Sequence, residues 1–101
     1  MIHELKCDPE YFAAIENNQK TFEVRKNDRS FHVGDYLALN ELDDTRTTYT
    51  GKCRLVKITY ILNNDEYCKE GYVIMSFRKQ ETMDKHFYNQ LLSNIKEVYQ
   101  E

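Results

Sequence analysis

Three charged residues, Lys20, Glu23 and Arg25, are spaced so that they can share one site. Glu23 and Arg25 lie two positions apart in an extended stretch, so their side chains point to the same face. A carboxylate beside a guanidinium fixes its orientation, and the free edge of the fork can then bind a phosphate, a carboxylate or a base edge. The opposing interpretation is an exposed, salt-bridged strand worth about 0–1 kcal/mol and without function.

Further candidate ligand-binding residues lie around this group. Lys26, Asn27 and Arg29 follow it directly, and Asn and Arg side chains can bind base edges and phosphates. The same residues also suit a plain turn with solvated cations. His3, on the first expected strand, can flank the same cleft or serve as an ordinary strand residue. Among the tyrosines, Tyr67 lies in an irregular polar loop and is the best candidate for stacking on a base.

The charge of the chain is unevenly distributed. Residues 17–29 carry four basic side chains and two carboxylates, a formal charge of +2, whereas the whole chain carries −3. The rest of the chain is therefore at −5. An acidic protein does not coat nucleic acid nonspecifically, because that binding depends on clustered Lys and Arg. A small basic island predicts a local and selective site instead.

The sequence holds no pattern typical of a metal or cofactor site. The three cysteines form no close pair, and no Cys-x-x-Cys or phosphate-binding loop occurs. We therefore expect no metal and no cofactor. The first residues lack an apolar signal segment, and no apolar run approaches the roughly 20 residues of a membrane helix. These features predict a reduced, cytoplasmic protein that does not bind membranes.

Hydrophobic periodicity predicts one helix among five strands. The expected strands are residues 2–6, 20–26, 36–42, 53–62 and 72–79. Between the first two, Asp8 and Pro9 suit the start of a helix, and Asn17 and Asn18 suit its end. The predicted fold class is α+β, mainly β: a small, mostly antiparallel barrel with a helix after the first strand.

The pattern changes near the end of the chain. From Glu81 onward, Met83, Phe87, Leu91, Ile95 and Val98 recur at helical spacing. We therefore expect a barrel domain over residues 1–79 and an appended helix over residues 80–101. The apolar stripe of that helix needs burial, either on the barrel or on a second copy of the chain.

The stretch from Asn18 to Arg25 resembles the signature of the ASCH domain, a small β-barrel of the PUA-like superfamily. That signature is Gly-x-Lys-x-x-Glu-x-Arg, and Lys20, Glu23 and Arg25 occupy its charged positions. Asn18 replaces the Gly and can adopt the same left-handed backbone. A wider similarity over about residues 3–78 resembles short ASCH-like proteins of bacteria and phages with no assigned function.

This resemblance implies a PUA-like barrel with a cleft beside the motif. ASCH domains are widely suspected of binding RNA or nucleotide-like ligands there, so we expect an RNA- or nucleotide-binding module. Some small members are amidohydrolases that deacylate a modified cytidine, and Lys20 matches their catalytic Lys. The position of their catalytic Thr holds Glu23 here, and no motif places their later catalytic Glu. A carboxylate beside Lys20 favours a charged ammonium and hence anion binding over proton abstraction.

Two alternatives remain beside the binding module. One is the small amidohydrolase, with Lys20 near the reacting amide. The other is an interaction protein that forms a homodimer through its C-terminal helix. Loss of RNA binding in an Arg25→Ala variant would favour the binding module. A monomer after deletion of residues 80–101 would favour the interaction protein.

Overall fold

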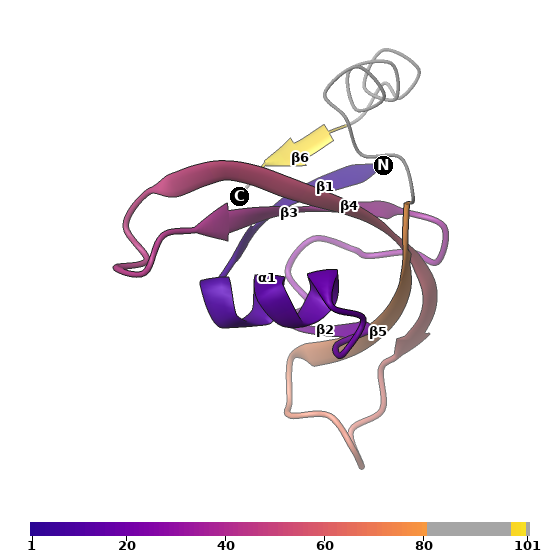
Figure 1. Cartoon of the computed structure of the whole chain (residues 1–101). Helices are drawn as coiled ribbons and strands as arrows, with labels where there is room; N and C mark the ends of the chain where they lie inside the picture. The colour runs from indigo at the N-terminus through magenta and orange to yellow at the C-terminus, as the bar shows by residue number, and fades with distance from the viewer. Residues whose placement is uncertain (81–97, 101) are drawn as a thin grey trace.

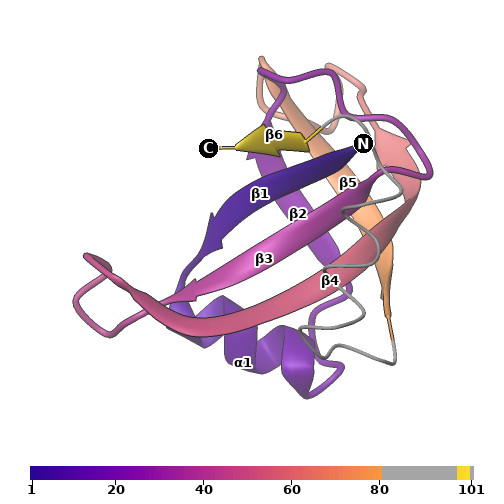
Figure 2. The same cartoon turned by 90° about the horizontal axis from the view of Figure 1, so that it is seen from above.

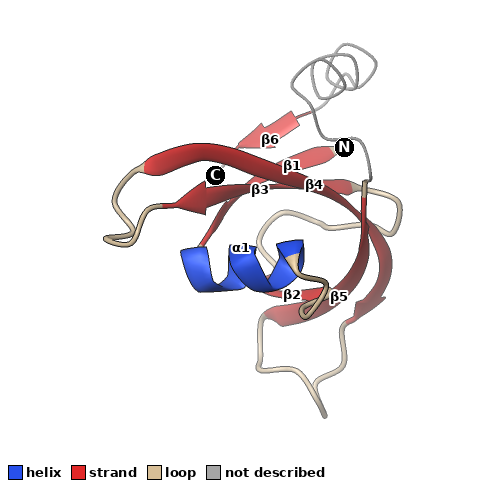
Figure 3. Ribbon diagram, in the orientation of Figure 1, coloured by secondary structure: helices blue, strands red, loops and turns tan. Residues whose placement is uncertain are grey.

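The protein is built on one curled sheet with a single helix in the described part of the chain (Figure 3). The computed structural model describes residues 1–80 and 98–100. Its elements, in chain order, are β1 (Ile2–Cys7), α1 (Pro9–Glu16), β2 (Phe22–Lys26), β3 (Tyr36–Leu42), β4 (Tyr49–Leu62), β5 (Tyr72–Lys79) and β6 (Val98–Gln100). The mainly-β class and the position of the helix after β1 are confirmed.

The strands pair in the order β2-β5-β4-β3-β1-β6. The β2–β5, β4–β5 and β3–β4 pairs are antiparallel, whereas β1 runs parallel to both β3 and β6. Figure 2 shows β6, β1, β3 and β4 side by side in that order. The sheet is therefore mixed: three of the five pairings between the described strands are antiparallel, as predicted, but both pairings of β1 are parallel, and the sheet forms a half-barrel where a barrel was expected. The parallel pairing is possible because α1 and β2 together form a long crossover between β1 and β3.

The sheet curls into a half-barrel that stays open between β2 and β1 (Figure 1). Register irregularities between Asn40 and Leu42 and between Ile58 and Tyr60 mark where β4 bends against its neighbours. Bulges of this kind increase the twist and curvature of a sheet. The edge strand β2 is thereby brought round toward the end of β1.

Helix α1 lies inside the curl and closes the core. Its Phe12 and Ile15, at helical spacing, are buried against the sheet. Pro9 occupies the first turn, where its missing N–H is not needed. Asp8 stands at the N-cap but makes no side-chain cap bond, contrary to expectation; its carboxylate lies 3.5 Å from the Arg46 Nε instead. Phe31 of the loop before β3 also belongs to the core. The sheet contributes the rest, namely Leu5, Cys7, Leu37, Leu39, Val56, Ile58, Val73, Met75 and Phe77.

The end of the chain is only partly described. Residues 81–97, on which most of the expected C-terminal helix falls, lie outside the described residues. Val98 and Tyr99, placed in that helix by their spacing, belong instead to β6, which pairs with Ile2, His3 and Glu4 of β1. The helix prediction is therefore wrong for these two residues, because their partner is a strand distant in sequence. No helix in the described part of the chain is long and apolar enough to cross a membrane.

Candidate ligand-binding pocket

A pocket of about 740 Å³ lies along β2, where the curled sheet stays open. Strand β2 supplies one wall, the end of β1 and the start of α1 supply another, and β3 and β5 contribute one residue each. The lining residues are Lys6, Cys7, Asp8, Tyr11, Lys20, Phe22, Glu23, Val24, Arg25, Lys26, Leu42 and Tyr72. This volume lies in the range of sites that hold small organic ligands.

Glu23 is the centre of the polar part of this pocket. Its Oε1 accepts a hydrogen bond from the Lys20 Nζ at 2.7 Å, and its Oε2 accepts one from the Arg25 Nε at 2.9 Å. The Glu23 side chain is 6% exposed, whereas those of Lys20 and Arg25 are 16% and 21% exposed. A nearly buried carboxylate is thus paired with two cations that keep access to the pocket.

The arrangement follows from the alternation of side chains along β2. Glu23 and Arg25 point inward, whereas Phe22 and Val24, which alternate with them and also line the pocket, are 43% and 49% exposed. In a purely structural edge strand the apolar side chains face the core and the charged ones face water. Here the charged side is turned inward, at a desolvation cost that an exposed salt bridge would not carry. This inversion is the strongest local sign that β2 serves a site.

Lys20 is fixed from several directions. Its ammonium donates to Glu23 and to the Phe22 backbone carbonyl, and it lies 5.4 Å from the centre of the Tyr11 ring and 5.0 Å from that of Phe22. Contacts of this length over aromatic faces are attractive for a cation. An ammonium has three N–H donors, and two are used by these hydrogen bonds among the described residues. The third can serve an anionic ligand.

The turn before β2 sets the position of Lys20. Asn18 has a φ of 60°, the left-handed conformation expected for the residue that replaces the signature Gly. The backbone N–H groups of Gln19 and Lys20 both donate to the Ala14 carbonyl at the end of α1. The turn therefore ties the start of β2 to the last turn of the helix, and the prediction for Asn18 is confirmed.

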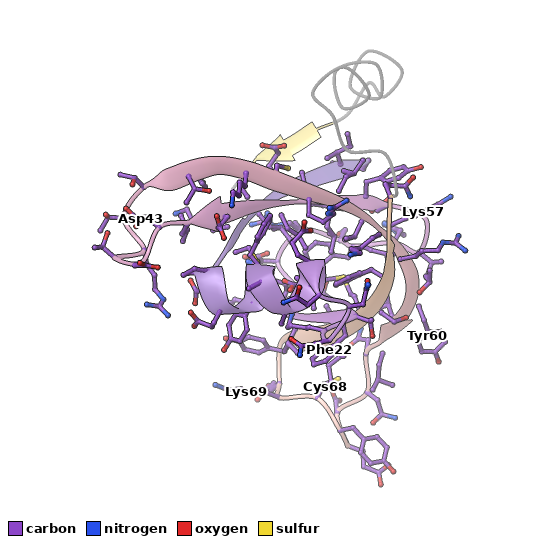
Figure 4. The ribbon with its side chains drawn as sticks, viewed as in Figure 1. Phe22, Asp43, Lys57, Tyr60, Cys68 and Lys69 are labelled. Carbon is purple, nitrogen blue, oxygen red and sulfur yellow. The ribbon has the colours of Figure 1, made fainter. Side chains whose placement is uncertain are left out.

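The pocket combines positive charge with aromatic surface. Four cationic side chains and two carboxylates line it, a formal charge of +2 on a chain that carries −3. Tyr11, Phe22 and Tyr72 provide the rings. In Figure 4 Phe22 lies below α1, apart from Lys57 at the upper right of the view. Cations beside exposed rings are the combination that binds phosphates and bases of single-stranded nucleic acids.

Cys7 lines the pocket but does not have the properties of a nucleophile. Burial raises the pKa of its thiol to about 12, and the neighbouring Glu23 carboxylate adds to the rise. A thiolate is the reactive form of cysteine, so at neutral pH this group is a small apolar wall residue. No group of three or more His, Cys, Asp or Glu side chains among the described residues could hold a metal ion.

The structure gathers only some of the residues singled out in the sequence. Lys20, Glu23, Arg25 and Lys26 line the pocket together. Asn27 does not; its backbone N–H donates to the Gly71 carbonyl in the adjoining loop. The Arg29 side chain is 8% exposed and lies outside the pocket lining, 3.2 Å from the Asp28 carboxylate.

Two further candidates lie elsewhere. His3 is fully buried, with its Nε2 hydrogen-bonded to the Asp35 carboxylate at 2.8 Å and its ring 4.6 Å from that of Phe31. It packs in the interior and does not flank the pocket, because its face of β1 is covered by the loop before β3. Tyr67 is 70% exposed and does not line the pocket either. Tyr11, Phe22 and Tyr72 hold the aromatic positions instead; the sequence offers Tyr11 and Tyr72 as stacking candidates behind Tyr67, but not Phe22.

The fold and the pocket together define a small, mainly-β domain with a curled half-barrel sheet and a basic, aromatic pocket at its open edge. Residues 2–77 match the family model described as "Domain of unknown function (DUF3850)", and the chain belongs to this family. It is also 32% identical over 74 residues to an "Uncharacterized 12.9 kDa protein in GpA 3'region" of Escherichia phage P2. That similarity covers 73% of this chain and 65% of the phage protein, so it spans less than two thirds of the relative.

Proposed function

We propose that the chain is a small RNA- or nucleotide-binding module of the ASCH, PUA-like type, whose ligand occupies the pocket along β2. The observation that carries this proposal is the pairing of the inward-facing Glu23 with Lys20 and Arg25 inside a hollow rimmed by aromatic rings. In this proposal the cations bind phosphate, and the rings stack on a base.

The fixed geometry of the two cations supports binding of an anion. Glu23 uses one carboxylate oxygen for each cation, so neither needs to reorganise when a ligand enters. Less side-chain entropy is then lost on binding, which raises affinity. Lys26 is exposed at the pocket rim and adds positive charge without restraint from the core.

The same geometry favours binding over hydrolysis. Lys20 donates to both a carboxylate and a backbone carbonyl, and an amine holds two such acceptors best in its charged form. A charged ammonium binds phosphate but cannot abstract a proton. Cleavage of an acylated cytidine by the wild-type protein, abolished in Lys20→Ala, would establish the amidohydrolase instead.

Binding of uridine 5′-monophosphate and of a labelled single-stranded oligouridine, measured by calorimetry and fluorescence anisotropy, tests the proposal. Arg25→Ala and Lys20→Ala are expected to weaken binding about tenfold or more, since hydrogen bonds to charged groups contribute about 1.5–3 kcal/mol. Lys26→Ala, which alters only the exposed rim, is expected to weaken it less.

Lys57→Ala is the matched control, because it removes one positive charge from β4, away from the pocket (Figure 4). It is expected to bind like the wild-type protein. Circular dichroism checks that each variant is folded. Absence of binding to either ligand, or equal affinities for Lys26→Ala, Lys20→Ala and the wild type, would overturn the proposal.

A further inference from the structure

A second hollow lies beside the first and shares Lys20 with it. Its volume is about 330 Å³, and it opens where the turn after α1 meets the end of β5. The residues that line it are Ile15, Asn18, Lys20, Thr21, Phe77, Arg78 and Lys79. Neither Arg78 nor Lys79 belongs to the signature stretch, so the sequence pattern did not connect them with the site.

The chemistry of this second hollow is that of an anion site. Three of its lining residues are cationic, and no carboxylate lines it. Asn18 and Thr21 add an amide and a hydroxyl that can donate hydrogen bonds. Phosphate groups in protein complexes are bound by this mixture of Arg, Lys, amide and hydroxyl donors.

The charges around the hollow leave Arg78 available. Arg78 is exposed on β5, and no carboxylate of the described residues lies within ion-pair distance of it. Lys79 donates to the Glu16 backbone carbonyl at 3.0 Å, which offsets the negative end of the helix dipole. The Glu16 carboxylate is held by Arg54, with hydrogen bonds of 2.5 and 2.8 Å. Glu16 is therefore already paired with Arg54, as Glu23 is with Lys20 and Arg25.

The register of β2 and β5 puts the two hollows on one line. Lys26 pairs with Tyr72 at one end, Phe22 pairs with Ser76 at the other, and the Phe77 N–H donates to the Thr21 carbonyl just beyond. From Lys26 to Thr21 the strand covers about 17 Å, at roughly 3.3 Å per residue. This length of about 17 Å is several times the roughly 3.4 Å rise per nucleotide of a stacked strand, so the two hollows together can accommodate more than one nucleotide.

We propose that the second hollow is a phosphate subsite for a neighbouring nucleotide, so that the ligand is a single-stranded oligonucleotide crossing over Lys20 rather than a free mononucleotide. This inference rests on the proposed function of the first pocket. In it, Lys20 binds the backbone between two nucleotides, and Arg78 binds the phosphate that follows. The subsite explains why cations accumulate on both sides of Lys20.

Affinities for uridine 5′-monophosphate and for a short oligouridine, measured with the wild type, Arg78→Ala and the control Lys52→Ala, test the subsite. Lys52 is exposed on β4 and lines neither hollow, whereas Lys57 is the cross-strand partner of Arg78. The wild type is expected to bind the oligonucleotide more tightly than the mononucleotide. Arg78→Ala is expected to reduce that preference about fivefold, and Lys52→Ala to preserve it. Loss of one phosphate contact also makes the slope of log K against log salt shallower by about 0.7 for a single strand.

The possible failures are distinguishable. Equal wild-type affinities for the two ligands, or a preference and salt slope unchanged in Arg78→Ala, would overturn the subsite and leave the first pocket as a mononucleotide site. Absence of binding to both ligands would overturn the subsite and the proposed function together.

Discussion

The Arg25 guanidinium donates from its Nη2 to the backbone carbonyl of Lys6, and so connects the edge strand β2 to the end of β1. These two strands are not neighbours in the sheet, and the pocket lies between them. The Arg25 Nε also donates a hydrogen bond to Glu23. This one planar side chain therefore contacts both the buried carboxylate of the pocket and the end of β1, which forms the opposite wall. Arg25 therefore has a structural role in addition to its proposed role in binding.

Arg25→Lys separates these roles, because it keeps the charge but removes the planar fork. A single ammonium on a flexible stem cannot reproduce the paired Nε and Nη2 geometry. We expect the free energy of unfolding to fall by about 1 kcal/mol, a value reduced for the partial exposure of the site. Urea denaturation measures this loss, and anisotropy with labelled oligouridine is expected to show weaker binding. Wild-type stability and affinity in Arg25→Lys would show that only the charge matters.

The left-handed conformation of Asn18 leads to a second prediction. Its φ of 60° is costly for residues with a β-carbon, by about 1–2 kcal/mol, and Asn lessens this cost with its short polar side chain. Asn18→Gly, which removes the β-carbon, is expected to leave thermal stability unchanged or slightly raised. Asn18→Ala is expected to lower it by about 1 kcal/mol.

Asn17 provides the matched control for this pair of substitutions. Its φ of −87° is ordinary for any residue, so Asn17→Ala lacks the conformational penalty. Equal destabilisation by Asn17→Ala and Asn18→Ala in thermal denaturation would show that the turn does not depend on the left-handed residue.

The parts of the fold that depend on local pattern could be predicted from the sequence. Strand β3 has the expected bounds Tyr36–Leu42, and the helix begins at Pro9 because the Asp-Pro pair is a local start signal. Strand β4 begins at Tyr49, four residues before the predicted start, because its first residues pair with β3 across the hairpin. The parallel pairing of β1 with β3 and β6 depends on contacts between residues that are distant in sequence, and hydrophobic periodicity does not predict such contacts.

The candidate site divides in the same way. Glu23 and Arg25 share one face of β2, and Lys20 lies in the turn just before it, so closeness in the chain placed the three together. Tyr72 and Arg78 reach the two hollows only through the antiparallel register of β5 with β2. His3 was expected at the cleft because β1 is adjacent to it, but the alternation of side chains along β1 turns this residue into the core. Local spacing thus identified the charged centre of the site but not its walls.

The buried thiol of Cys7 provides a third prediction. With a pKa raised to about 12, only about one thiol in 10⁵ is ionised at pH 7. We expect Cys7 to resist iodoacetamide at pH 8 in the folded protein and to react readily in urea, with peptide mass spectrometry reporting each cysteine separately. The thiol of Cys53, whose pKa burial raises to about 11, is expected to react faster than that of Cys7.

Occupation of the pocket is expected to slow the modification of Cys7 further, because this residue lines it. Cys53 lies outside the lining and serves as the internal control in the same sample. Rapid alkylation of Cys7 at pH 8 in the native protein would contradict both its burial and its assignment as a wall residue.

The His3–Asp35 pair gives the protein a defined pH dependence. Burial lowers the pKa of His3 below its ordinary 6.5; the hydrogen bond and charge of Asp35 oppose this shift, and the charge of Arg29 adds to it. The unfolded chain then binds the proton more readily than the folded protein. The stabilising contribution is complete above about pH 6.5 and is lost as the pH falls from there through the folded pKa of His3.

We therefore expect the free energy of unfolding to decrease between pH 7.5 and pH 5.5, above the range in which carboxylates titrate. His3→Gln is expected to flatten this slope, whereas His32→Gln, at a side chain that is 76% exposed, is expected to retain it. Urea denaturation across the pH range measures the slopes, and the NMR titration of the His3 ring reports its pKa directly. A His3 pKa of 6.5 would abolish this contribution and a higher one would reverse its sign, and either would contradict the argument that burial outweighs the Asp35 carboxylate.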